Sequence, residues 1–302
     1  MRFDVPRPYQ SVWHVKSFAM KLTFPLSPQS TTPLREVVMF AVLTIALTWL
    51  FWLPGGVLPA GIGNLLLGIG SFAPLAVVVF LEIWLQKFSL APLSWWKTIS
   101  ARGVAVAALL PIFILMPVFM LRFNQGTLEV GKLFSNALGM WFSLIVLLIL
   151  AFAEEIGWRA YLLPRLKTLP LYLTNLFVGL LWFVWQLPLV FAGRYNTSEN
   201  FGAFFAAMFF YSLLITPFFN RLARRADYSP ILSAILRAGL QFTIAVYFLQ
   251  GRADPLTDIF GTLTIGWLFI LNLILFSQLW QGKKPPAEIS ELERVMPLEV
   301  GS

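Results

Sequence analysis

Long apolar runs dominate the chain, and its polar residues gather in short segments between them. Eight of these runs approach or exceed the length of roughly 20 residues that a helix needs to cross a bilayer. They cover about residues 37–58, 62–85, 104–121, 135–163, 173–193, 201–219, 229–250 and 258–280. The pattern predicts an all-α fold, a polytopic membrane protein built as an eight-helix transmembrane bundle.

The same pattern divides the chain into three parts. Residues 1–36 form a basic leader whose stretch SVWHVKSFAMKLTF is predicted either as an interfacial helix or as a disordered segment. Residues 37–281 form the membrane domain, and residues 282–302 are polar and proline-bearing, which is typical of a flexible tail.

The composition agrees with a membrane protein and excludes several chemistries. Hydrophobic residues make up 58% of the 302 positions and charged residues only 12%, an excess that a soluble domain of this length cannot bury. Cysteine is absent, so disulfides and thiolate catalysis are excluded. The single histidine, His14, lies in the leader, so no predicted span carries an imidazole.

The net charge of +8 reflects topology better than nucleic-acid binding. The two ends and the loops after the second, fourth and sixth spans hold 16 of the 22 Lys and Arg residues, and the other four loops hold 4. This asymmetry predicts that both termini are cytoplasmic. We expect an integral multi-pass protein of the bacterial cytoplasmic membrane that binds no nucleic acid, with the basic cluster 220–227 contacting lipid headgroups.

Few ionisable residues lie inside the predicted spans, and such residues are costly there and usually functional. Glu155 and Arg159 are four residues apart and can pair on one helix face. That pairing leaves Glu154, which points about 100° away, without a partner on its own helix. Glu82 lies near a span end and is interpreted as interfacial.

Counting residues from the ends of the spans places three polar side chains at one depth. Glu154, Gln186 and Arg237 each lie roughly 12–20 Å from the same membrane surface, at 1.5 Å per residue. The sequence therefore predicts one polar centre built from a carboxylate, an amide and a guanidinium on three helices.

The motifs around these residues resemble those of a known family. EEIGWR, followed by AYLLPRL, resembles the EExxxR motif of the CAAX-prenyl endopeptidase and bacteriocin-processing (CPBP, or Abi) family. WFVWQ resembles the second motif, with Trp182 in place but Gln186 where the family has histidine. SPILSAILRAGLQF keeps the frame of the third, with Arg237 and Gln241 replacing histidine and asparagine, so residues 135–250 form the family-like core.

The resemblance implies an eight-span intramembrane peptidase of the CAAX-endopeptidase type. In that family the first glutamate, here Glu154, activates a water together with the second-motif histidine. The third-motif histidine and asparagine hold the oxyanion, while the second glutamate and the arginine, here Glu155 and Arg159, shape the site. The resemblance makes Glu154, Glu155 and Arg159 the candidate catalytic residues.

The chain departs from this pattern where the chemistry is most demanding. Gln186 can orient a water but cannot accept a proton, and Arg237 cannot ligate a metal. Without a histidine in the spans, we expect no metal site and no cofactor. Arg237 is instead predicted to pair with Glu154, which would make that carboxylate a weaker base and join the fourth and seventh spans.

Three alternatives follow. The first is a non-catalytic or impaired member of the family that binds or assembles with other integral membrane proteins, or with a prenylated or transmembrane peptide segment. The second is an active intramembrane endopeptidase with Glu154 as the general base. The third is an unrelated membrane subunit or transporter whose motif match is accidental.

Overall fold

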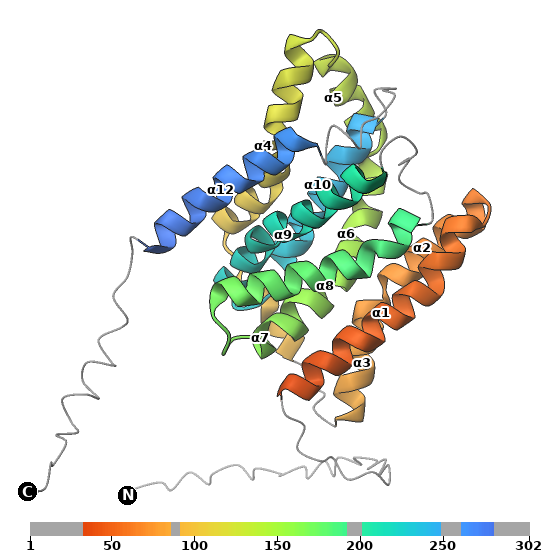
Figure 1. The fold of residues 1–302 in the computed structure, drawn as a ribbon, viewed down its shortest axis with the longest axis vertical. Coiled ribbons are helices and arrows are strands. Elements are labelled where there is room, and N and C mark those ends of the chain that lie inside the picture. Colours follow the sequence, from red (N-terminus) through yellow and green to blue (C-terminus); the bar gives the residue numbers. More distant parts are fainter. Residues whose placement is uncertain (1–32, 86–90, 192–200, 249–260, 281–302) are drawn as a thin grey trace, which may run out of the picture. The chain divides into compact units, whose positions relative to one another are not determined.

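The computed structural model describes residues 33–85, 91–191, 201–248 and 261–280, which form helices and the short turns between them (Figure 1). Six helical segments in this part of the chain are long and apolar enough to cross a membrane, and two shorter apolar helices follow them. The six are Leu34–Val57, Ala60–Trp84, Ala101–Asn124, Trp141–Arg165, Leu171–Phe191 and Phe201–Arg225; the shorter two are Ile231–Tyr247 and Thr262–Leu275. The predicted all-α, multi-pass fold is confirmed.

The helices present large apolar side chains outward, which fits a surface covered by lipid. Leu50, Leu65, Leu109 and Phe142 are each more than 60% exposed. A protein surrounded by water would bury most of these side chains. The outer surface therefore contacts the hydrocarbon of a bilayer.

The second predicted span consists of two helices. Helix α1 (Pro33–Val57) is followed by α2 (Ala60–Ser71), and a single residue separates α2 from α3 (Ala73–Trp84). Pro74 occupies the first turn of α3, where a missing backbone N–H costs no helical hydrogen bond. The break leaves Ser71 as the last residue of α2, buried within the bundle.

The predicted fourth span begins at residue 135, whereas the helix that forms it begins at Trp141. A separate short helix, α5 (Val130–Gly139), precedes α6 (Trp141–Glu155). Beyond α6 the backbone continues as one π-helical segment, η2 (Ile156–Leu162), and then as α7 (Leu163–Arg165). A Cβ added at Gly157 would lie 2.5 Å from the Cβ of Pro74, so glycine allows η2 to lie directly against α3.

The remaining helices pack around the end of α6 that carries the glutamates, which is the buried part of that helix. Helix α10 (Ile231–Phe248) packs against α6 and α4 (Ala101–Asn124), and α8 (Leu171–Phe191) packs against α9 (Phe201–Arg225) and α1. Helix α12 (Thr262–Trp280) packs against α9 and α4, and a short 3₁₀ segment, η1 (Ala91–Thr98), precedes α4. Helix α6 packs against α10, and less extensively against α2 and α3. Figure 1 labels these helices.

Two predictions lie outside the described residues. They are the interfacial helix in the leader and the flexible tail over residues 282–302. His14 lies in the same undescribed part of the chain.

Candidate functional site

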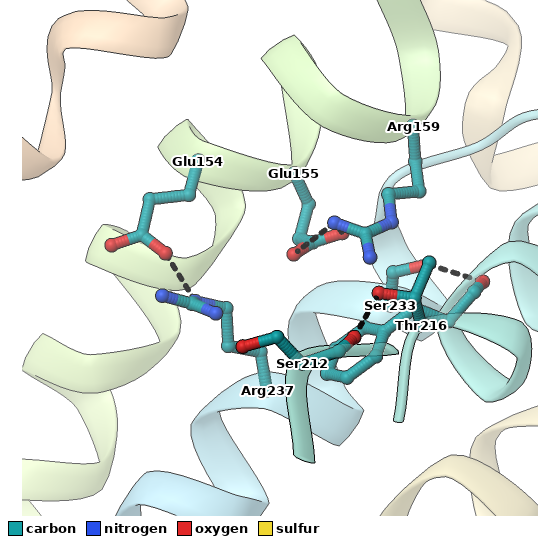
Figure 2. A network of polar contacts seen from close by, with 8 residues as sticks. Glu154, Glu155, Arg159, Ser212, Thr216, Ser233 and Arg237 are labelled. Atoms are coloured by element: carbon teal, nitrogen blue, oxygen red, sulfur yellow. Dashed lines mark hydrogen bonds and ion pairs between the residues drawn. The ribbon is translucent and has the colours of Figure 1, made fainter. Parts of the chain in front are cut away.

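The adjacent carboxylates of Glu154 and Glu155 end α6 in the interior of the bundle. Glu154 is 2% exposed and Glu155 is fully buried. In a medium of low dielectric a charged carboxylate needs a cation or several hydrogen bonds to offset the loss of hydration. Each glutamate has its own arginine, and the two arginines come from different directions (Figure 2).

Glu155 pairs within its own helical segment. The Nη1 atom of Arg159 lies 3.2 Å from Oε1 and 3.1 Å from Oε2 of Glu155. The arginine is also buried, and its guanidinium lies 4.8 Å from the centre of the Phe219 ring on α9. The pair spans the junction between α6 and the π-helical segment, so it stabilises an irregular backbone at a fixed place.

Glu154 pairs across helices. Its Oε2 forms an ion pair with Nε of Arg237 on α10 (Figure 2). The two helices approach closely because Ala151, Ala234 and Ala238 are the buried residues between them. The ion pair predicted from the sequence is present, and it joins the fourth and seventh apolar segments.

Two tryptophans hold the guanidinium of Arg237 in place. Its Cζ lies 5.0 Å from the Trp182 ring and 5.5 Å from the Trp185 ring, within the range of cation–π attraction. The indole N–H of Trp185 donates to Oγ1 of Thr48 on α1 over 2.8 Å, which fixes the orientation of that ring. Trp182, the aromatic residue of the second motif, therefore supports the arginine of the third.

A cavity of about 350 Å³ borders the Glu154–Arg237 pair. Gln186 and Gln241 line it together with this pair, and Ser71 lies on its α2 side. A smaller cavity of about 100 Å³ lies beyond the guanidinium, and Gln186, Arg237 and Gln241 line both spaces. The residues predicted to share one depth thus meet around one cavity, whereas Glu155 and Arg159 do not line it.

The chemistry available at this cavity is asymmetric. Glu154 is the carboxylate in its lining, and the two glutamines can bind water without accepting a proton. Oε1 of Gln241 is buried and has no hydrogen-bond partner in the described residues, so it can accept one from a ligand or a water. Arg237 supplies positive charge suited to an oxyanion or a carboxylate.

Sequence reasoning missed the contribution of the first two apolar segments to the cavity. Trp52 on α1 and Asn64, Leu67 and Ser71 on α2 all line it. The indole N–H of Trp52 donates to the carbonyl oxygen of Leu67 over 2.9 Å, which ties the two helices together. The two polar residues Asn64 and Ser71 within the second apolar run could have indicated that this run lines the cavity.

A second ionic cluster also escaped the sequence reasoning. Arg165, at the end of α7, bonds Glu36 of α1 over 2.7 Å and Glu82 of α3 over 3.0 Å. Its guanidinium also lies 3.4 Å from the centre of the Tyr161 ring. Glu82 therefore contributes to a connection between three helices rather than acting as an isolated interfacial residue.

A metal ion would need several donor side chains in one place. The part of the chain that the structure describes holds no cluster of three or more His, Cys, Asp or Glu side chains. Two amides, a guanidinium and one carboxylate are a poor donor set for zinc. The absence of a cofactor stays a prediction.

Comparisons with known proteins cover the first two motif regions. A family model described as Rce1-like type II CAAX prenyl endopeptidase matches residues 136–225, the segment from α5 to the end of α9. One similar protein is the CAAX prenyl protease 2 of Methanococcus maripaludis, which is 26% identical over 198 aligned residues. The alignment covers 58% of this chain and 71% of that relative.

Proposed function

The chain belongs to the Rce1-like family of type II CAAX prenyl endopeptidases, and we propose that it is a member with lost or impaired peptidase chemistry. On this proposal it binds a prenylated or transmembrane peptide segment, or assembles with another integral membrane protein, without cutting it. Family membership removes the alternative in which the motif match is accidental.

The ion pair between Glu154 and Arg237 is the observation that carries the proposal. A buried carboxylate bound by a guanidinium is a weaker base than an equally buried carboxylate without that partner, because protonation would leave the arginine unpaired in the bundle. Gln186 cannot share the proton in place of the histidine that the family motif carries at this position. Among the described residues that line the cavity, Glu154 therefore has no second proton acceptor beside it, which supports the proposal of impaired catalysis.

The space beside the ion pair supports a binding role. A cavity of about 350 Å³ lies within the size range of sites for small ligands, and Leu67, Leu150 and Leu189 give it apolar walls. Arg237, Gln186 and Gln241 provide polar groups at one place on its lining. An apolar chain ending in a polar or anionic group matches this distribution.

A second candidate, an active endopeptidase, is favoured by one specific observation. Glu154 rather than Glu155 lines the cavity, which is the arrangement required if Glu154 activates a water. Substrate binding would then displace the Arg237 guanidinium from Glu154 and so free the carboxylate to act as the base. The displaced guanidinium would stabilise the developing oxyanion. The relative named CAAX prenyl protease 2 is consistent with this reading.

A gain-of-function experiment separates the two candidates. The full chain is reconstituted in lipid nanodiscs and incubated with a farnesylated peptide that ends in a CAAX sequence, with cleavage followed by mass spectrometry. We expect no cleavage by the unmodified protein and cleavage by the variant Gln186→His, Arg237→His, Gln241→Asn. Adding Glu154→Ala to that variant should abolish the gained activity.

The opposite outcome is equally informative. Cleavage by the unmodified protein that is lost with Glu154→Ala would establish the active endopeptidase and overturn the first candidate. Binding is tested separately by photocrosslinking a farnesylated peptide with a non-cleavable bond. Leu189→Trp should reduce crosslinking by filling the cavity, whereas Leu176→Trp, on the lipid-exposed side of the same helix, should leave it unchanged.

A further inference from the structure

A second cavity of about 350 Å³ lies away from the glutamates, where α8, α9 and α12 meet. Three arginines from the last two turns of α9 line it: Arg221, Arg224 and Arg225. Leu171, Pro217 and Leu275 supply its apolar part. The cavity therefore combines strong positive charge with hydrocarbon walls.

The three arginines share one face of α9 because they are three and four residues apart. Like charges so placed repel one another, and that repulsion is relieved when an anion lies between them. Over the described ranges, no carboxylate lies within ion-pair distance of any of them. The described part of the protein therefore provides no carboxylate that neutralises the cluster.

The guanidinium groups are also incompletely hydrogen-bonded. Nη1 of Arg221 and both Nε and Nη2 of Arg224 are buried atoms without a hydrogen-bond partner in the described part of the chain. A basic residue that serves only to orient the protein in the membrane has no need to bury its donors. Buried, unpaired guanidinium donors lining a cavity indicate an anionic ligand.

The position of the cavity identifies the source of the anion. Helix α9 has 25 residues and is about 37 Å long, so it exceeds a hydrocarbon core of about 30 Å and its arginine-bearing end reaches the headgroup layer. Tyr172, Leu176 and Leu273 each follow a lining residue in the sequence, and all three are exposed large hydrophobic side chains. A molecule with a phosphate and acyl chains fits both environments at once.

We propose that Arg221, Arg224 and Arg225 form a specific binding site for the phosphate group of an anionic membrane phospholipid, whose acyl chains lie along α8 and α12. The site is separate from the Glu154 cavity, and it does not depend on whether the protein cleaves peptides. Arginine suits this role because its planar guanidinium donates two hydrogen bonds to one phosphate.

Lipid titration followed by native mass spectrometry tests this site. The full chain in detergent micelles is titrated with dioleoylphosphatidylglycerol, and separately with dioleoylphosphatidylcholine. We expect clear preference for the anionic lipid, and a loss of about 100-fold in its affinity in the variant Arg221→Gln, Arg224→Gln, which removes charge-assisted hydrogen bonds from two guanidinium groups. Circular dichroism and size-exclusion chromatography establish that the variant is folded.

The matched control removes two positive charges near the same end of α9. Lys97 and Arg102 are exposed and do not line the cavity, and Oγ1 of Thr98 between them donates to the carbonyl oxygen of Ala226 over 2.8 Å. The variant Lys97→Gln, Arg102→Gln should lose at most a few fold, because exposed charges contribute only a screened attraction.

Three results would overturn the proposal. The first is equal binding of the two lipids by the unmodified protein, a result that holds even if the arginine variant fails to fold. The second is an equal loss of lipid affinity in the arginine variant and in the control. The third is binding of inorganic phosphate in micelles without phospholipid, at the same concentrations at which phosphate displaces the phospholipid in a competition measurement. The last result would assign the site to a soluble anion.

Discussion

Glu154 and Glu155 are neighbours in the sequence, yet their side chains lie in two different environments. Glu154 faces a cavity of about 350 Å³ and reaches an arginine on another helix. Glu155 is fully buried and pairs with Arg159 on its own segment. We call these the open half and the closed half of the site, respectively.

The difference separates two uses of the same residue type. In the closed half the ion pair supports the π-helical segment and the packing of Arg159 on Phe219, so its effect is structural. In the open half the ion pair borders a cavity, and it joins two helices rather than two turns of one helical segment. In this chain the stretch EEIGWR thus combines a supporting carboxylate, Glu155, with one that faces a cavity, Glu154.

The sharpest test of the two halves is chemical accessibility, because the protein has no cysteine of its own. Ser71 lines the cavity, whereas Ser212 is fully buried and does not line it. The hydroxyl of each serine donates to the carbonyl oxygen four residues earlier. We expect N-ethylmaleimide to label Ser71→Cys and not Ser212→Cys in the folded protein, measured by mass spectrometry. Equal labelling of the two variants would remove the distinction.

Removing one charge from the closed half should cause the largest loss of stability. Glu155→Leu leaves Arg159 charged, buried and unpaired, which costs about 3–5 kcal/mol in the free energy of unfolding. The measurement is unfolding in mixed detergent micelles, followed by tryptophan fluorescence. The double variant Glu155→Leu, Arg159→Met should recover most of the loss, since no lone charge remains; failure to recover would mean that the pair is needed for more than neutralisation.

Removing one charge from the open half should cause a smaller loss in the free energy of unfolding. Arg237→Gln leaves Glu154 beside a cavity that water can enter, so we expect a loss of about 1–3 kcal/mol, the cost of an incompletely satisfied polar group. A cycle with Glu154→Gln measures the coupling between the two residues in the same unfolding assay. A loss equal to that of Glu155→Leu would show that the cavity stays dry and that the two halves do not differ in solvation.

Hydropathy and regular helical geometry were enough to predict the all-α multi-pass fold and the meeting of three polar side chains. Glu154, Gln186 and Arg237 line one cavity because the constant rise of a helix converts residue counts into depth. The pairing of Glu154 with Arg237 followed from the cost of a lone buried charge. The roles of these residues in catalysis or binding remain predictions.

What the sequence did not predict depends on lateral packing and on backbone irregularity. Hydropathy does not say which helices are neighbours, so the contribution of Asn64 and Ser71 to the cavity was missed. Arg165 was counted only as a topological charge, although it pairs with Glu36 and Glu82. A π-helical turn shares its residue preferences with an α-helix, so apolar periodicity does not reveal it.

The smallest expected effect separates the charge of Arg237 from its shape. Arg237→Lys keeps a cation opposite Glu154 but loses the contacts of the guanidinium with the rings of Trp182 and Trp185, which are worth about 0.5–2 kcal/mol. We therefore expect Arg237→Lys to be more stable than Arg237→Gln in the same unfolding measurement. If the two variants are equally unstable, contact with the two tryptophan rings, and not the ion pair with Glu154, holds the Arg237 side chain in place. The open half would then depend on aromatic packing, as Arg159 on Phe219 suggests for part of the closed half.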